Sequence, residues 1–293
     1  MIGIKLSGGL GNQMFQYGFI VNISSHANTS FFLDKEGTPI ELYKYFKLKK
    51  NTSYFIDTLF FNYTGYKLFF SHYLRRLFYH IIKLCFIKKH FKMSSNTEIL
   101  QVQDLTYKNT LFEGYFQSPL YFNEKEVTKY FTLKDTVIKT YRTKFEFILR
   151  QKKIVVIHIR KTDYVQLGHL NLGGNDLSLP LIYYHQLIKR IHTEDNYYVF
   201  ISDEPELISA EFSYLLNKFI SKESAIIDFQ HMLNADICII ANSTFSWWAA
   251  YLNKKKNKIV YCPRYFLGFK INKEYPVNIF PHNWLQITVP SII

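Results

Sequence analysis

Short apolar runs alternate with amphipathic segments in the second half of the chain, a pattern that predicts buried strands separated by helices. Ile154–Ile157, Tyr197–Ile201 and Ile237–Ile240 are too short for buried helices and are rich in β-branched or aromatic residues. By the same criteria we predict short strands at 225–227 and 258–261 and helices at 140–150, 181–191, 229–234 and 246–253. Because strand and helix alternate with short connections, we predict an α/β fold with a doubly wound parallel sheet and right-handed crossovers.

The chain opens with an apolar strand at 1–6, a glycine-rich turn at 7–13 and an apolar helix from Met14. Glycines let a backbone approach a ligand closely, and a helix amino terminus presents N–H groups that suit an anion or a sugar hydroxyl. The spacing is neither G-x-G-x-x-G nor a P-loop, so neither standard chemistry follows, and a plain tight turn is the alternative. The opening strand lacks the layout of a signal peptide, so we expect no export.

Composition narrows the class of protein without selecting a ligand. The 293 residues are 48% hydrophobic and support one large or two ordinary cores. The formal net charge of +13 suggests an anionic partner, but a nucleotide, a nucleic acid and an acidic membrane all fit that sign. Cys85, Cys238 and Cys262 are scattered through apolar segments, which is typical of reduced packing residues rather than disulfides or a zinc site.

Residues 66–92 are basic, aromatic and helical in pattern, and contain no acidic residue. Such a segment can lie among the headgroups of an anionic membrane, where each basic residue contributes about 1 kcal/mol. It cannot span a bilayer, because basic residues interrupt every apolar run before ~20 residues. Ordinary amphipathic helices with a basic solvent face are the alternative, and nucleic acid is disfavoured because no known fold signature accompanies the charge.

Polar clusters follow three of the predicted strands. His158 and Arg160 follow the first, Asp203 follows the second, and Ser243 and Thr244 follow the third. Taken singly, each cluster has an ordinary structural explanation. The first could be an Arg–Asp ion pair, the second a turn at a strand end, and the third a helix N-cap. Because parallel strands end at one edge of a sheet, and ligands bind outside the carboxyl ends, the three together predict a nucleotide site.

Four segments resemble glycosyltransferase family 11, in the order and similar spacing of that family and across nearly the whole chain: residues 7–17, 158–164, 200–204 and 239–252. The resemblance implies a bacterial α-1,2-fucosyltransferase that moves L-fucose from GDP-fucose to a galactoside with inversion. It implies a GT-B-like α/β fold of two Rossmann-type lobes with the donor site in the cleft between them. We therefore expect residues 1–150 to form an acceptor-side lobe and residues 151–293 to bind GDP-fucose.

The resemblance also implies roles for individual residues. Arg160 would neutralise the β-phosphate, His158 would orient the diphosphate, and Asp203 would read guanine. Asp163 is the candidate general base, or else a carboxylate that fixes Arg160. The remaining donor-binding residues are expected to be Gly9, Gly11, Asn12, Ser243, Thr244 and Phe245.

No metal or other cofactor is expected, because the chain has no Asp-x-Asp pair and the family needs none. The family motif usually has a second arginine where this chain has Lys161, and a glycine where it has Thr162. Lysine keeps the charge but lacks the bidentate fork, so the donor remains open. The alternatives are the same fold with another donor or acceptor sugar, or a non-catalytic basic protein that binds anions or membranes. We expect a bacterial cytoplasmic protein, with peripheral contact to the inner face of the membrane through 66–92 as one option, and no nucleic acid partner.

Overall fold

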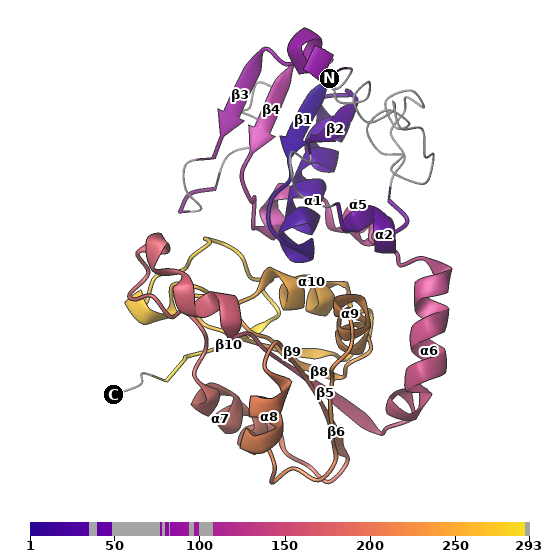
Figure 1. Cartoon of the computed structure of the whole chain (residues 1–293), viewed down its shortest axis with the longest axis vertical. Helices are drawn as coiled ribbons and strands as arrows, with labels where there is room; N and C mark the ends of the chain where they lie inside the picture. The colour runs from indigo at the N-terminus through magenta and orange to yellow at the C-terminus, as the bar shows by residue number, and fades with distance from the viewer. Residues whose placement is uncertain are drawn as a thin grey trace. The chain divides into compact units, whose positions relative to one another are not determined.

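The computed structural model describes residues 1–34, 40–48, 77, 80–81, 83–93, 97–99 and 108–290. The chain divides into two compact units, Met1–Thr132 and Leu133–Ile293 (Figure 1). The boundary predicted near residue 150 is thus displaced, because helix α6 (Asp135–Leu149) belongs to the second unit. The physical reason is a buried contact in which the Tyr141 hydroxyl on α6 lies 3.0 Å from His231 Nδ1 on helix α9 (Ala225–Leu233).

The first unit is built on a four-stranded parallel sheet with the strand order β2-β1-β4-β3. The strand and helix predicted at the start of the chain are confirmed, with the glycine-rich turn between them. The elements of this unit are β1 (Ile2–Lys5), α1 (Leu10–His26), β2 (Phe31–Asp34), α2 (Leu42–Tyr45), β3 (Lys89–Lys92), β4 (Thr110–Glu113), the 3₁₀ helix η2 (Pro119–Tyr121) and α5 (Glu124–Tyr130).

Helix α1 is buried on nearly every side, and its middle part, residues 14–23, is apolar apart from Gln16 and Asn22. Its Phe19 ring stacks on Phe116, with 3.7 Å between the ring centroids, and Tyr17 packs edge-on against Phe31 of β2. Aromatic contacts of this kind fix the helix firmly, so its first turn has a defined position behind the end of β1.

The second unit is built on a six-stranded parallel sheet with the strand order β10-β9-β8-β5-β6-β7. The predicted doubly wound parallel sheet is confirmed, although β7 and β10 were not predicted. Besides α6 and α9, the elements are β5 (Lys153–Ile159), the 3₁₀ helices η3 (Thr162–Gln166) and η4 (Gly168–Leu170), α7 (Leu181–Ile191), β6 (Asn196–Ser202), α8 (Pro205–Glu211), β7 (Lys218–Ile220), β8 (Ile237–Ile239), α10 (Thr244–Leu252), β9 (Ile259–Pro263), the 3₁₀ helix η5 (Phe269–Ile271) and β10 (Leu285–Ile287).

Helices cover both faces of this sheet, with α7 and α8 on one side and α9 and α10 on the other (Figure 1). Strand β5 shows why. Its alternate residues Val155 and Ile157 share a buried cluster with Tyr183 of α7, whereas His158 faces the ring of Phe245 on α10. Side chains alternate between the faces of a strand, so a strand buried on both faces has the continuous apolar pattern seen at 154–157.

Two predicted elements differ from the structure. The strand predicted at 225–227 is wrong, because these residues form the first turn of α9, and Lys218–Ile220 takes the edge position in the sheet instead. In the basic segment, residues 83–86 are helical as predicted, but Lys89–Lys92 form strand β3. Residues 66–76, 78–79 and 82 of that segment lie outside the described residues. In the part of the chain that is described, no helix is both long and apolar enough to cross a bilayer.

Candidate active site

The predicted polar clusters of the second unit lie at one level of its sheet. Ile159 pairs with Ser202, and Ile157 pairs with Ile239. Extending each register past the last pair places Arg160, Asp203 and Asn242 in one row beyond the carboxyl ends of β5, β6 and β8. Parallel sheets bind ligands at this edge.

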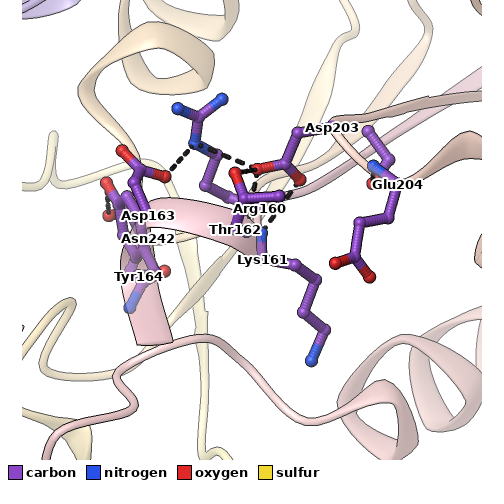
Figure 2. A network of polar contacts seen from close by, with 9 residues as sticks. Arg160, Lys161, Thr162, Asp163, Tyr164, Asp203, Glu204 and Asn242 are labelled. Carbon is purple, nitrogen blue, oxygen red and sulfur yellow. Dashed lines mark hydrogen bonds and ion pairs between the residues drawn. The ribbon is translucent and has the colours of Figure 1, made fainter. Parts of the chain in front are cut away.

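Arg160 is held by two carboxylates through a single nitrogen (Figure 2). Its Nε lies 2.7 Å from Asp163 Oδ1 and 3.6 Å from Asp203 Oδ2. Burial lowers the pKa of the guanidinium, but the hydrogen bond to Asp163 and the charges of both acids raise it above its usual value. Among the described residues, neither Nη nitrogen has an ion-pair or hydrogen-bond partner, and in Figure 2 both point away from the two acids. That edge of the guanidinium can bind two oxygens of a phosphate.

Asp203 accepts three hydrogen bonds from the turn that follows Arg160. Its Oδ1 accepts from the Lys161 backbone N–H at 3.0 Å, and its Oδ2 accepts from the Thr162 N–H at 3.0 Å and the Thr162 hydroxyl at 2.5 Å (Figure 2). Burial raises the pKa of this carboxyl, but the bonds from Thr162 and Lys161 outweigh burial and hold the pKa below its usual value. Asp203 is therefore an anion at neutral pH.

Lys161 does not substitute for a second arginine at this edge. Its ammonium group donates to the Leu179 carbonyl at 3.0 Å and to Ser178 Oγ at 3.3 Å. In Figure 2 the side chain runs away from the Arg160 guanidinium. The departure from the family motif thus places this lysine in a structural contact with the segment that precedes α7.

His158 is almost fully buried, with its ring centroid 5.6 Å from that of Phe245 in the first turn of α10. Burial and the nearby Arg160 charge lower its pKa to about 3, so the imidazole is neutral at physiological pH. Its buried Nδ1 atom has no hydrogen-bond partner among the described residues. A neutral imidazole can donate or accept one hydrogen bond there, according to its tautomer.

The amino terminus of α10 lies next to this histidine. Ser243 is the N-cap residue, but its side chain makes no capping hydrogen bond. Ser243 thus occupies the N-cap position, but the side-chain hydrogen bond that defines a simple N-cap is not made among the described residues. The first N–H groups of α10 and the adjacent hydroxyls of Ser243 and Thr244 can bind phosphate oxygens.

Buried amides hold the glycine-rich turn of the first unit. Gln16 accepts from the Ser7 N–H at 3.1 Å and donates to the Gly114 carbonyl at 2.9 Å, so it joins the ends of β1 and β4. Gly8 has φ +71°, and a Cβ atom there would lie 2.4 Å from Asn12 Nδ2, so this position requires glycine. By contrast, a Cβ atom on Gly9 would meet no described atom within 4 Å. Gly9 is therefore dispensable for the turn itself.

The predicted site residues fall into two groups. His158, Arg160, Asp163, Asp203, Ser243, Thr244 and Phe245 all belong to the second unit, at the carboxyl edge of its sheet. Gly9, Gly11 and Asn12 belong to the first unit, where the Asn12 side-chain carbonyl accepts from Gln117 Nε2 at 2.9 Å.

Three residues at or near this edge were not predicted. Tyr164 donates its hydroxyl to the Asn242 carbonyl at 3.1 Å and so joins the turn after β5 to the end of β8. Arg264 follows β9 at the same level as Asn242, where its guanidinium lies over the Tyr265 ring. Asp228 on α9 bonds the Ser221 hydroxyl at 2.5 Å, and burial raises its pKa to about 7. The position of Arg264 after a predicted strand was available as a signal, whereas Asp228 lies inside a helix and had none.

In the described ranges, no group of three or more His, Cys, Asp or Glu side chains is arranged to hold a metal ion.

Comparison with solved structures defines the class of fold. Over 85% of this chain and 91% of the other, the chain superposes on the fucosyltransferase NodZ from Bradyrhizobium with a TM-score of 0.54 at 11% identity. A POFUT1 structure in complex with GDP-fucose gives a TM-score of 0.52 at 13% identity, over 89% of this chain and 97% of the other. Together with the two parallel α/β sheets, these similarities confirm the predicted GT-B-type fold.

Comparison of sequences then defines the family. The model of glycosyl transferase family 11 matches residues 1–287, and the chain belongs to this family of glycosyltransferases. It is 28% identical to an alpha-1,2-colitosyltransferase from Escherichia coli, over 97% of both chains. It is also 34% identical, over 38% of this chain and 39% of the other, to the O-antigen biosynthesis glycosyltransferase WbnK from Escherichia coli.

Proposed function

We propose that the protein transfers L-fucose from GDP-fucose to the 2-hydroxyl of a terminal galactoside, with inversion, in the synthesis of a bacterial polysaccharide. One observation carries the proposal: the Nη edge of Arg160 is left open while two acids hold its Nε. A guanidinium fixed in this way is suited to a diphosphate leaving group. Membership of the family and the O-antigen assignment of one relative support the setting.

The remaining donor contacts come from groups next to Arg160. Arg160 stabilises the charge that develops on the β-phosphate as the glycosidic bond breaks, and the α10 amino terminus with Ser243 and Thr244 holds the other phosphate oxygens. Neutral His158 supports that helix end through Phe245. From the first unit, Gly9, Gly11 and Asn12 contact the donor. We propose that no metal is required, since a guanidinium and a helix end supply the positive charge.

Asp163 is the proposed general base for the acceptor hydroxyl. Its side chain is 58% exposed, and only its Oδ1 is engaged by Arg160, so Oδ2 can receive a proton. The same ion pair also fits a carboxylate that merely fixes Arg160. The two roles differ in what Asp163→Asn changes, because a base acts on turnover and a positioning group acts on donor binding.

A second candidate is transfer of another sugar from the same kind of donor. The relative that aligns over 97% of both chains is an alpha-1,2-colitosyltransferase, which favours an α-1,2 linkage and leaves the sugar open. Lys161 also differs from the usual arginine, although its ammonium group is engaged at Leu179.

We propose peripheral contact with the inner face of the cytoplasmic membrane through the basic segment, within residues 66–92. Leu77, Ile81 and Leu84 are exposed at helical spacing, and the exposed side chains of Lys88 and Lys89 follow them. An apolar stripe beside basic residues suits an anionic bilayer surface. Lys83 serves the fold instead, because its Nζ lies 2.9 Å from Asp34 Oδ2, on a carboxylate with no exposed surface.

The test is release of GDP from GDP-fucose in the presence of lactose, with and without a chelator. We expect release in both conditions, together with a rise in melting temperature with GDP and not with UDP, CDP or ADP. GDP-colitose in place of GDP-fucose tests the second candidate. Absence of both GDP release and stabilisation by GDP would favour the non-catalytic anion-binding alternative.

A further inference from the structure

The Asp203 carboxylate already accepts hydrogen bonds from the backbone and a side chain of its own protein. A carboxylate has about four acceptor positions, and three are occupied here by Lys161 N–H, Thr162 N–H and the Thr162 hydroxyl. Oδ2 accepts two of these bonds and also faces Arg160 Nε at 3.6 Å. A guanine edge presents two adjacent N–H donors and needs one free acceptor on each oxygen. Reading guanine would therefore require Asp203 to release the turn.

The turn itself needs such a partner. After β5 ends at Ile159, Lys161 and Thr162 leave the sheet, and their N–H groups have no partner strand. Buried or half-buried N–H groups left without an acceptor cost free energy, so a carboxylate that takes both stabilises one conformation of the turn. Because the same carboxylate faces Arg160 Nε, the turn and the guanidinium are fixed together.

We infer that Asp203 is a positioning residue, which acts on the donor through Arg160 by holding the turn 160–162, and that the Thr162 hydroxyl belongs to the same clamp. The inference rests on the proposed binding of a nucleoside diphosphate by Arg160 and deepens it. Groups other than Asp203 would then recognise the guanine ring. Thr162, which replaces the family's usual glycine, adds a bond that glycine cannot make.

The first arm compares GDP with inosine diphosphate, which lacks the 2-amino group of guanine. Asp203→Asn keeps the shape but loses acceptor capacity, so we expect both nucleotides to bind about tenfold more weakly with an unchanged ratio of their affinities. If Asp203 reads guanine, the variant instead loses the preference for GDP over inosine diphosphate, and that result would overturn the inference. Glu204→Gln is the matched control: in Figure 2 no contact joins this neighbouring carboxylate to the turn, and both affinities should stay unchanged.

The second arm tests the hydroxyl. Thr162→Val removes its bond to Asp203 and should weaken GDP binding by a few fold, whereas Thr162→Ser keeps the hydroxyl and should restore it. Because the two residues act on one turn, the double variant with Asp203→Asn should be no worse than Asp203→Asn alone. Fully additive losses would contradict a shared clamp.

The third arm needs no ligand. Hydrogen exchange at the Lys161 and Thr162 amides should accelerate in Asp203→Asn and not in Glu204→Gln, while the melting temperature falls by only a few degrees. Unchanged exchange would overturn the inference even if the protein bound GDP. Accelerated exchange in a protein that binds no GDP would refute the proposed function and leave the clamp standing.

Discussion

The turns that follow β5 and β1 are held by different kinds of side chain, one charged and one neutral. In the second unit, the carboxylate of Asp203 holds the turn after β5, beside a guanidinium. In the first unit, the neutral amide of Gln16, with no exposed surface, holds the turn after β1 to the end of β4. A carboxylate fixes backbone and also pairs with an arginine, whereas an amide fixes backbone and adds no charge. The turn of the second unit therefore carries charge beside an arginine, whereas the turn of the first unit is held by neutral groups.

The largest effect should come from removing the positive charge of Arg160 at the carboxyl edge of the second unit's sheet. Arg160→Ala should lower turnover by about a thousandfold or more, because stabilisation of the leaving diphosphate is lost. GDP release at saturating donor measures it. Arg160→Lys keeps a charge without the fork and should recover only part of the rate. Near-normal turnover in the alanine variant would remove Arg160 from the mechanism.

Asp163→Asn distinguishes a general base from a carboxylate that only fixes Arg160. We expect turnover to fall by about a hundredfold while the GDP-fucose affinity changes by only a few fold, since general base catalysis typically contributes about a hundredfold or more. Steady-state kinetics together with donor titration give both quantities. The opposite result, a collapse of affinity with normal turnover at saturation, would assign Asp163 to fixing Arg160.

Substitutions at two adjacent glycines, Gly8 and Gly9, test the turn after β1 in the first unit. Gly9→Ala should leave the melting temperature unchanged and lower turnover about tenfold, because its Cβ meets nothing in the described chain but would obstruct a donor that approaches the backbone. Gly8→Ala is the contrasting variant: its positive φ and the nearby Asn12 side chain predict a loss of about 1–2 kcal/mol of stability. Full activity in Gly9→Ala would exclude close approach of the donor at Gly9.

The buried carboxyl group of Asp228, away from Arg160, should make the stability of the protein depend on pH. Burial raises its pKa from 3.8 to about 7, so between these values the folded chain keeps a proton that the unfolded chain has lost, and stability falls as pH rises. Asp228→Asn should therefore raise the melting temperature by a few degrees at about pH 8 and have little effect at about pH 4. Melting curves across this range measure it. An equal shift at both ends would contradict the assignment.

The smallest effect on catalysis should come from the basic segment of the first unit. Lys88→Glu with Lys89→Glu should weaken binding to anionic vesicles, by about 1 kcal/mol per removed charge or more, and leave turnover on lactose unchanged. Vesicle sedimentation measures it. Lys83→Glu is not equivalent, because it would place a second carboxylate against buried Asp34 and destabilise the fold. Equal vesicle binding by the Lys88 and Lys89 variant would reject membrane contact through these lysines.

Local pattern by itself determined much of the second unit. The runs at 154–157, 197–201 and 237–240 predicted three adjacent strands, and the polar residues after them predicted the edge where His158, Arg160 and Ser243 lie. The reason is that a buried parallel strand has a continuous apolar sequence, and polar residues mark its end. The order of motifs also indicated the family, which the match over residues 1–287 confirmed.

Tertiary structure alone decided which partner each polar group takes. Asp203 and Thr162 are 41 positions apart in the chain and meet only because β5 and β6 pair in one register. Likewise the helix predicted at 140–150 was placed before a boundary near residue 150, but Tyr141 packs α6 on α9 of the second unit. Residues 225–227 were predicted as a strand, but Lys218–Ile220 forms the edge strand instead. Sequence periodicity records whether a residue is buried, but register and long-range packing determine what it is buried against.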